Sequence, residues 1–125
     1  MTENQIATIV LDYAFEIHRA LGPGLLESAY QKCLYMDLKS EGFKVEKEVV
    51  LPIRYKELEI EQGYRIDLLV EDKVVVELKA VDAIIDKHKA QLLTYIKLGE
   101  YKLGLLINFN ETLLKNGIKR IVNNL

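Results

Sequence analysis

Two acidic residues and a lysine lie close together in the middle of the chain, in a pattern that can bind a cation. Asp67 belongs to one short apolar run, and Glu77 and Lys79 belong to the next one. Two such runs, joined by the polar residues 71–73, predict a β-hairpin. The arrangement of the three side chains can therefore be derived from the register of the two strands.

The length of the loop decides that register. A three-residue loop places Asp67 directly opposite Glu77, whereas a two-residue loop would place Asp67 against Leu78. The three-residue loop gives one wholly apolar face, on which the pairs are Ile66 with Leu78, Leu68 with Val76, and Val70 with Val74. The other face carries Asp67 with Glu77, Arg65 with Lys79, and Leu69 with Val75. A one-residue slip would mix the two faces, so the pattern favours the three-residue loop.

This register predicts a cation site. Residues directly opposite each other have Cβ atoms about 4.5–5.5 Å apart, and like charges there destabilise a sheet. Mg²⁺ is typically held by one or two carboxylates together with waters and substrate phosphate. Lys79 points to the same face as Glu77. Its side chain could orient an attacking water, deprotonate that water when the amine is neutral, or stabilise charge on a phosphate as the ammonium. The simpler alternative is a solvated face on which Arg65 and Lys79 pair with the two acids.

The periodicity of the remaining sequence predicts one α/β domain over residues 1–125. Apolar residues at three- and four-residue steps predict an N-terminal pair of helices and a third helix, at 6–21, 25–40 and 83–98. Extended patterns predict strands at 45–55, 58–62, 64–70, 74–79, 103–109 and 117–122. We expect a central mixed sheet of about four to five strands, with an antiparallel meander, one crossover helix and a returning strand. Pro52 indicates an edge or bent strand.

Composition excludes several classes of protein. The chain has 125 residues, half of them hydrophobic, and a formal net charge of −2, which argues against a disordered tail. No apolar run reaches the ~18 residues of a membrane span, and the segment after Met1 lacks the pattern of a signal peptide. We therefore expect a cytoplasmic protein with no membrane partner. The slightly acidic charge gives no overall attraction to nucleic acid, so such a function requires a local site.

The spacing of Asp67, Glu77 and Lys79 resembles the D…(D/E)-x-K signature of the PD-(D/E)xK nuclease superfamily. The order of helices and strands also resembles the restriction-endonuclease-like core of that superfamily. Gly24, Glu27 and Tyr30 fit the G-x-x-E-x-x-Y pattern that names a family of small proteins with this presumed fold. The last match is a Q-x-x-x-Y element similar to that of RecB-like nucleases, formed here by Gln91 and Tyr95.

The resemblance implies roles for particular residues. Asp67 and Glu77 are implied as metal ligands and Lys79 as the catalytic cation, with Mg²⁺ or Mn²⁺ as cofactor. The superfamily's proline is replaced by Ile66, and that proline does no chemistry. Glu27 resembles a helix glutamate that adds a metal ligand. The alternative for Glu27 is a favourable interaction with the helix dipole.

Four further residues are expected at the substrate or around the site: Gln91, Tyr95, Arg65 and Tyr30. Gln91 and Tyr95 are four apart and share one helix face. Alternatively, Tyr95 is a core aromatic residue and Gln91 lies at the border of the core. We interpret His18 and His88 as core histidines without a role in the site.

The leading functional hypothesis is a metal-dependent nuclease that hydrolyses phosphodiester bonds of nucleic acid, with DNA favoured over RNA. The alternative is a non-catalytic, nuclease-like binding or assembly module. A two-carboxylate glycosidase fits less well because of Lys79 and the small size of the chain. That small size suggests a partner protein or a homodimer for substrate recognition. A second stripe on the first helix, formed by Leu11, Phe15 and His18, predicts the homodimer because it needs cover.

Overall fold

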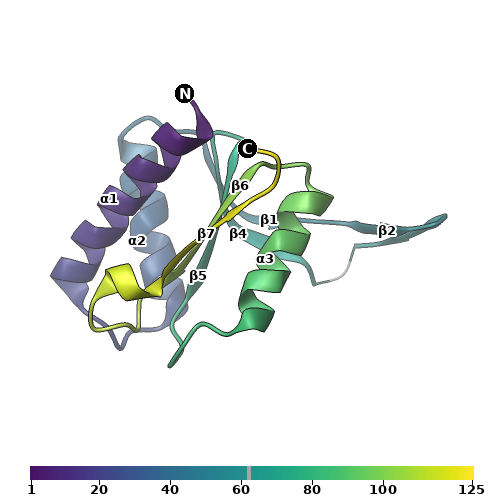
Figure 1. Cartoon of the computed structure of the whole chain (residues 1–125). Helices are drawn as coiled ribbons and strands as arrows, with labels where there is room; N and C mark the ends of the chain where they lie inside the picture. The colour runs from purple at the N-terminus through teal and green to yellow at the C-terminus, as the bar shows by residue number, and fades with distance from the viewer. Residues whose placement is uncertain (62) are drawn as a thin grey trace.

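A five-stranded mixed sheet forms the centre of the structure, a computed structural model that describes residues 1–61 and 63–125. The strand order is β1-β4-β5-β6-β7 (Figure 1). β5 and β6 pair in parallel, and the other neighbouring strands pair antiparallel. The strands are Val45–Val50 (β1), Arg65–Val70 (β4), Val74–Lys79 (β5), Leu103–Asn108 (β6) and Ile118–Val122 (β7). The predicted α/β class with a restriction-endonuclease-like arrangement is confirmed.

Helices cover both faces of this sheet (Figure 1). α1 (Glu3–Leu21) and α2 (Glu27–Ser40) lie on one face, and α3 (Asp86–Leu98) lies on the other. α3 is the crossover that parallel strands require between β5 and β6. α2 and α3 begin two to three residues later than their periodicity predicted, because Leu26 and Ile85 have extended backbones. Within the part of the chain that the structure describes, no helix is long and apolar enough to cross a membrane.

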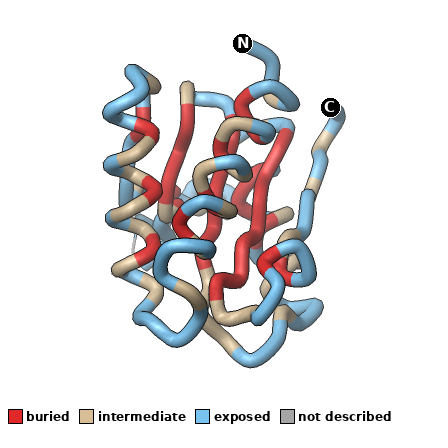
Figure 2. The backbone as a smooth tube through the Cα atoms, turned by 90° about the vertical axis from the view of Figure 1, so that its left-hand side faces the viewer, coloured by how far each residue is buried: buried red, intermediate tan, exposed pale blue. Residues whose placement is uncertain are grey.

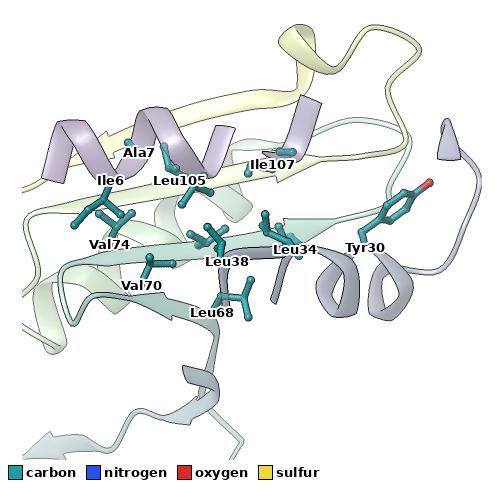
Figure 3. Packing of buried hydrophobic residues seen from close by; sticks show 14 of the residues in the cluster. Ile6, Ala7, Tyr30, Leu34, Leu38, Leu68, Val70, Val74, Leu105 and Ile107 are labelled. Carbon is teal, nitrogen blue, oxygen red and sulfur yellow. The ribbon is translucent and has the colours of Figure 1, made fainter. Parts of the chain in front are cut away.

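Two buried cores form on either side of the sheet, whose central strands are buried (Figure 2). The helix-pair core lies under α1 and α2 and includes Ile6, Ala7, Tyr30, Leu34, Leu38, Leu68, Val70, Val74, Leu105 and Ile107 (Figure 3). The α3 core consists of Leu51, Ile66, Leu69, Val75, Leu92, Tyr95, Ile96 and Leu106. β6 is buried along its whole length, as its apolar run predicted.

The predicted long strand over 45–55 is wrong, because the chain leaves the sheet near Pro52. Proline has no N–H to donate to a ladder. Ile53–Tyr55 (β2) and Leu58–Ile60 (β3) instead form a separate two-stranded hairpin that projects from the sheet (Figure 1). Residues 58–62 therefore do not extend the central sheet, and Gln62 lies outside the described residues. The Leu51 N–H donates to the Tyr64 carbonyl oxygen over 2.8 Å at the base of the hairpin.

The second stripe of α1 is covered by the chain itself. Leu11 and Phe15 are partly buried against the helix-pair core. His18 Nε2 donates to the carbonyl oxygen of Glu111, 2.7 Å away in the C-terminal part of the chain. His18 is thus a satisfied histidine, as expected. We predicted a homodimer because this stripe needed a partner to cover it. Since the chain covers the stripe itself, the structure gives no support for that dimer.

Candidate active site and metal centre

The β4–β5 hairpin has the predicted register at its turn. Val70 pairs with Val74, Leu69 with Val75, and Leu68 with Val76. The loop is three residues long, and Glu71 and Asp72 in it have positive φ angles of 54° and 56°. The alternative two-residue loop is therefore excluded.

Asp67 and Glu77 lie one step beyond the last of these pairs, where side chains bond across the two strands. The Asp67 N–H donates to Glu77 Oε1 over 3.1 Å. In the other direction, the Leu78 N–H donates to Asp67 Oδ2 over 2.8 Å. Each carboxylate thus accepts a bond from the backbone of the opposite strand, in place of a ladder carbonyl. The two residues thus lie opposite each other as predicted. They are joined by these two bonds from backbone N–H groups to side-chain oxygens, and not by a regular cross-strand backbone pair.

The regular alternation of faces breaks at the same place. Ile66 packs in the α3 core with Leu69 and Val75, whereas we predicted it on the opposite face, with Leu68. On the neighbouring strand, Glu48 has a positive φ of 53°. Irregular backbone at Glu48 and the side-chain bonds at Asp67 explain the difference, because the prediction assumed an uninterrupted pleat.

Burial makes Asp67 and Glu77 weaker acids than ordinary carboxyl groups. The side chain of Glu77 is buried, and burial, followed by the charge of Asp67, raises the pKa of Glu77 to about 9. Burial also raises the pKa of Asp67, against the lowering effect of the Leu78 N–H. A buried carboxylate is unfavourable unless it is paired or binds a cation. Among the described residues, neither acid forms an ion pair within 4 Å. The surface salt bridges of the simpler alternative are therefore not formed here.

Lys79 ends β5 and is partly buried beside this pair. Its backbone pairs with Asn108 of β6, and its carbonyl oxygen accepts from the Phe109 N–H over 2.9 Å. Its positive charge lowers the pKa of Asp67, Glu77 and Glu27, although other effects raise each of them further. The ammonium group is thus close enough to act on all three carboxyl groups.

Glu27 is the first residue of α2 and approaches the site from the helix pair. Burial, followed by the charge of Asp67, raises the pKa of its carboxyl group. The segment before it is held by Tyr30, whose hydroxyl donates to the Gly22 carbonyl oxygen (2.6 Å) and accepts from the Leu25 N–H (3.2 Å). Tyr30 is fully buried and stacks on Phe109 with ring centroids 4.4 Å apart. Tyr30 thus anchors the segment that precedes Glu27.

The donor set fits a hard divalent cation bound by two carboxylates. Asp67 and Glu77 each accept a backbone N–H at one carboxylate oxygen, so each bonds to the backbone through only one of its two oxygens. Mg²⁺ accepts this arrangement because it keeps several waters. Across residues 1–61 and 63–125, no three His, Cys, Asp or Glu side chains are arranged to hold a metal together. Glu27 therefore does not complete a three-carboxylate cage in this structure.

Sequence reasoning missed two residues that lie at the site. Gln31 of α2 donates from Nε2 to Glu48 Oε1 (2.9 Å) and to the Asp67 carbonyl oxygen (3.2 Å). The charge of Glu48 raises the pKa of Asp67 and of Glu27. Gln31 could have been found from its position one helical turn after Glu27. Glu48 could not, because its approach depends on β1 pairing with β4 across the intervening β2–β3 hairpin.

The remaining predicted residues divide into two groups. Gln91 and Tyr95 are joined by a bond of 3.2 Å from Nε2 to the hydroxyl. Burial and then the charge of Glu77 raise the pKa of Tyr95. Arg65 is exposed, and its backbone pairs with Val50 of β1. Arg65 and Lys79, which we predicted to face each other, are not among the residue pairs of the β4–β5 ladder.

Comparison with known proteins gives one match. A family model described as the PD-(D/E)XK nuclease superfamily matches residues 4–121. That range includes nearly all of α1, both strands of the carboxylate hairpin, and most of β7. No curated protein and no solved structure matches the chain significantly.

Proposed function

We propose that this chain, which belongs to the PD-(D/E)XK nuclease superfamily, hydrolyses phosphodiester bonds of nucleic acid, with DNA as its preferred substrate. Members of the superfamily are generally dependent on divalent metals, and we propose Mg²⁺ or Mn²⁺ here. The observation that carries the proposal is the pair of Asp67 and Glu77, buried together without an ion-pair partner among the described residues. Lys79 lies on the same strand, two residues beyond Glu77.

Each side chain has a defined part in this proposal. Asp67 and Glu77 hold the cation, which when bound supplies Lewis acidity and lowers the pKa of its water. Lys79 donates to a phosphate oxygen and stabilises the charge that develops there in the transition state. Glu27 would be a third carboxylate beside the bound cation. Gln31 positions Asp67 and Glu48 through its two bonds.

Membership of the G-x-x-E-x-x-Y family is part of the same proposal. Gly24, Glu27 and Tyr30 match its pattern, and the structure supports a reason for that spacing. Tyr30 fixes the Gly22–Leu25 segment through its hydroxyl. Glu27, which follows this segment, is thereby held near Asp67. The pattern thus joins one anchoring residue to one residue of the site.

A cleavage assay with matched variants tests the proposal. Labelled single- and double-stranded DNA and RNA are incubated with the wild type in Mn²⁺, Mg²⁺ or EDTA. Asp67→Asn removes a carboxylate of the buried pair. Asp72→Asn removes an exposed carboxylate from the turn of the same hairpin. We expect metal-dependent cleavage by the wild type and by Asp72→Asn, and loss of cleavage in EDTA and in Asp67→Asn.

The alternative function gives a different result in the same assay. A non-catalytic module binds nucleic acid or protein but leaves every substrate intact in both metals. Cleavage that persists in EDTA, or that is equal in Asp67→Asn and Asp72→Asn preparations, would also contradict the proposal.

A further inference from the structure

A cavity of about 540 Å³ lies between α3 and the base of the β2–β3 hairpin. Ile53 and Tyr64 line it from the hairpin side, and Gln91, Thr94 and Tyr95 line it from α3. Its volume is within the range of sites that enclose one small ligand. None of the steps proposed above for Asp67, Glu77 and Lys79 uses this cavity.

The lining of the cavity has the chemistry of a nucleobase site. Tyr64, an exposed tyrosine, offers an aromatic ring, and aromatic rings bind bases of any identity by stacking. The side chains of Gln91 and Thr94 carry donors and acceptors that can bond to the edge of a base. Lys87, which also lines the cavity, can bind the adjoining phosphate.

The position of the cavity connects it to the carboxylate pair. Tyr95 lines the cavity and is also a member of the α3 core, in which it packs with Ile66 and Val75. Ile66 directly precedes Asp67 in β4, and Val75 lies two residues before Glu77 in β5. One side chain therefore borders both the cavity and the strands that carry the site.

We infer that this cavity binds one unpaired nucleobase of the substrate strand, so that the protein acts on single-stranded nucleic acid in preference to an intact duplex. The inference rests on the nuclease function proposed above. A paired base enters such a cavity only after it leaves the stack, which is unfavourable. The net charge of −2 supplies little of the phosphate attraction that dominates duplex binding. Stacking in the cavity is the interaction that replaces it.

Binding measurements with three variants test the inference. Tyr64→Ala removes one stacking ring, and Tyr64→Phe keeps the ring. Tyr55→Ala is the matched control, because Tyr55 is an exposed tyrosine of the β2–β3 hairpin that is not among the residues lining the cavity. Fluorescence anisotropy is measured in Ca²⁺ with a labelled single strand and with the duplex of the same sequence. A gel verifies that the probes stay intact.

We expect the wild type to bind the single strand at least tenfold more tightly than the duplex. Tyr64→Ala should weaken single-strand binding roughly 5- to 150-fold, the range for loss of one stacked base. Tyr64→Phe and Tyr55→Ala should stay close to the wild type. Equal binding of strand and duplex, or equal effects of Tyr64→Ala and Tyr55→Ala, would overturn the inference. A free mononucleotide that competes as well as the strand would overturn it too, because the ligand would then be the nucleotide alone.

A photo-crosslink gives a readout that does not depend on a variant. A single strand carrying 5-iodouracil is irradiated with the wild type, and the modified peptide is identified by mass spectrometry. We expect modification of Tyr64, and modification confined to other parts of the chain would contradict the inference.

The two proposals fail in different ways. Binding of the single strand that depends on Tyr64, without any cleavage, supports the base site and contradicts the nuclease function. Cleavage of duplex that depends on Asp67 and is unchanged in Tyr64→Ala supports the nuclease function and overturns the base site.

Discussion

Both ends of the β4–β5 hairpin carry acidic residues, which are exposed at the turn and buried at the open end. At the turn, Asp72 is exposed and accepts from Lys44 Nζ over 2.6 Å, and this hydrogen bond lowers the pKa of Asp72. At the open end, Glu77 is buried beside Asp67, and the pKa values of both carboxyl groups are raised. A carboxylate's chemistry is thus decided by its place in the hairpin.

Backbone hydrogen bonding explains the difference. Near the turn the ladder runs from Val70 to Leu68, so the strands satisfy each other's backbone and acids remain in solvent. Beyond Leu68, the N–H groups of Asp67 and Leu78 find their acceptors in the two carboxylates. Buried N–H groups require such partners. The bonds that complete the backbone also hold two like charges together, and a divalent cation stabilises that arrangement.

Replacing one lysine at each end should give the largest contrast. Lys79→Ala should lower metal-dependent cleavage by about 10²–10³-fold or more, the effect of losing a group that stabilises transition-state charge. Lys73→Ala, in the turn, should leave the rate unchanged. Rates are measured with labelled oligonucleotide in Mn²⁺, and circular dichroism verifies the fold of both variants. Equal rates for Lys79→Ala and the wild type would remove Lys79 from the catalytic machinery.

Mn²⁺ should stabilise the protein through the open end alone. A ligand that binds only the folded state adds about 2.7 kcal/mol at a hundredfold excess over Kd, on the order of 4 °C in Tm per kcal/mol for a domain of this size. Thermal melts should show a rise of several degrees in the wild type and in Asp72→Asn. The rise should be much smaller in Asp67→Asn. A wild type indifferent to millimolar Mn²⁺ would mean that the open end does not bind the metal.

The raised pKa of Glu77 predicts how stability depends on pH without metal. The ordinary value is 4.5 and the folded value is about 9, so the folded state binds more protons between these limits. The free energy of unfolding should therefore fall as pH rises through this window, by at most about 1.4 kcal/mol per pH unit. Urea unfolding in EDTA should show this slope in the wild type and a shallower one in Glu77→Gln. Parallel curves for the two proteins would contradict the assigned shift.

Neutralising one acid at each end should have small and opposite effects in EDTA. Asp67→Asn keeps the shape of the side chain and removes a repulsive charge, so its Tm should equal or exceed that of the wild type. Asp72→Asn loses its partner Lys44 and should melt slightly lower, because exposed ion pairs stabilise little. The reverse order would restore the salt-bridge interpretation of Asp67.

Local features of the chain could be predicted, and features that depend on distant segments could not. The three-residue turn and the meeting of Asp67 with Glu77 follow from alternation within 15 residues, counted from Arg65 to Lys79. The crossover helix follows from its apolar period. These predictions succeed because a hairpin or a helix is specified by its own sequence.

The approach of Glu48 and the position of Ile66 arise from another cause. β1 pairs with β4 across the β2–β3 hairpin, a pairing that no local period encodes. We predicted the face of Ile66 from a regular alternation of side chains along the strands. The irregular backbone at Glu48 interrupts that alternation. Both misses lie at the site, where side chains replace part of the ladder.

Direct titration of Mn²⁺ into the metal-free protein, followed by electron paramagnetic resonance, tests whether the open end of the hairpin is a metal site. The signal of free Mn²⁺ decreases as the ion binds. We predict one saturable site in the wild type and in Asp72→Asn, and loss of that site in Asp67→Asn. Equal binding by the wild type and Asp67→Asn, or loss of the site in Asp72→Asn alone, would contradict the account.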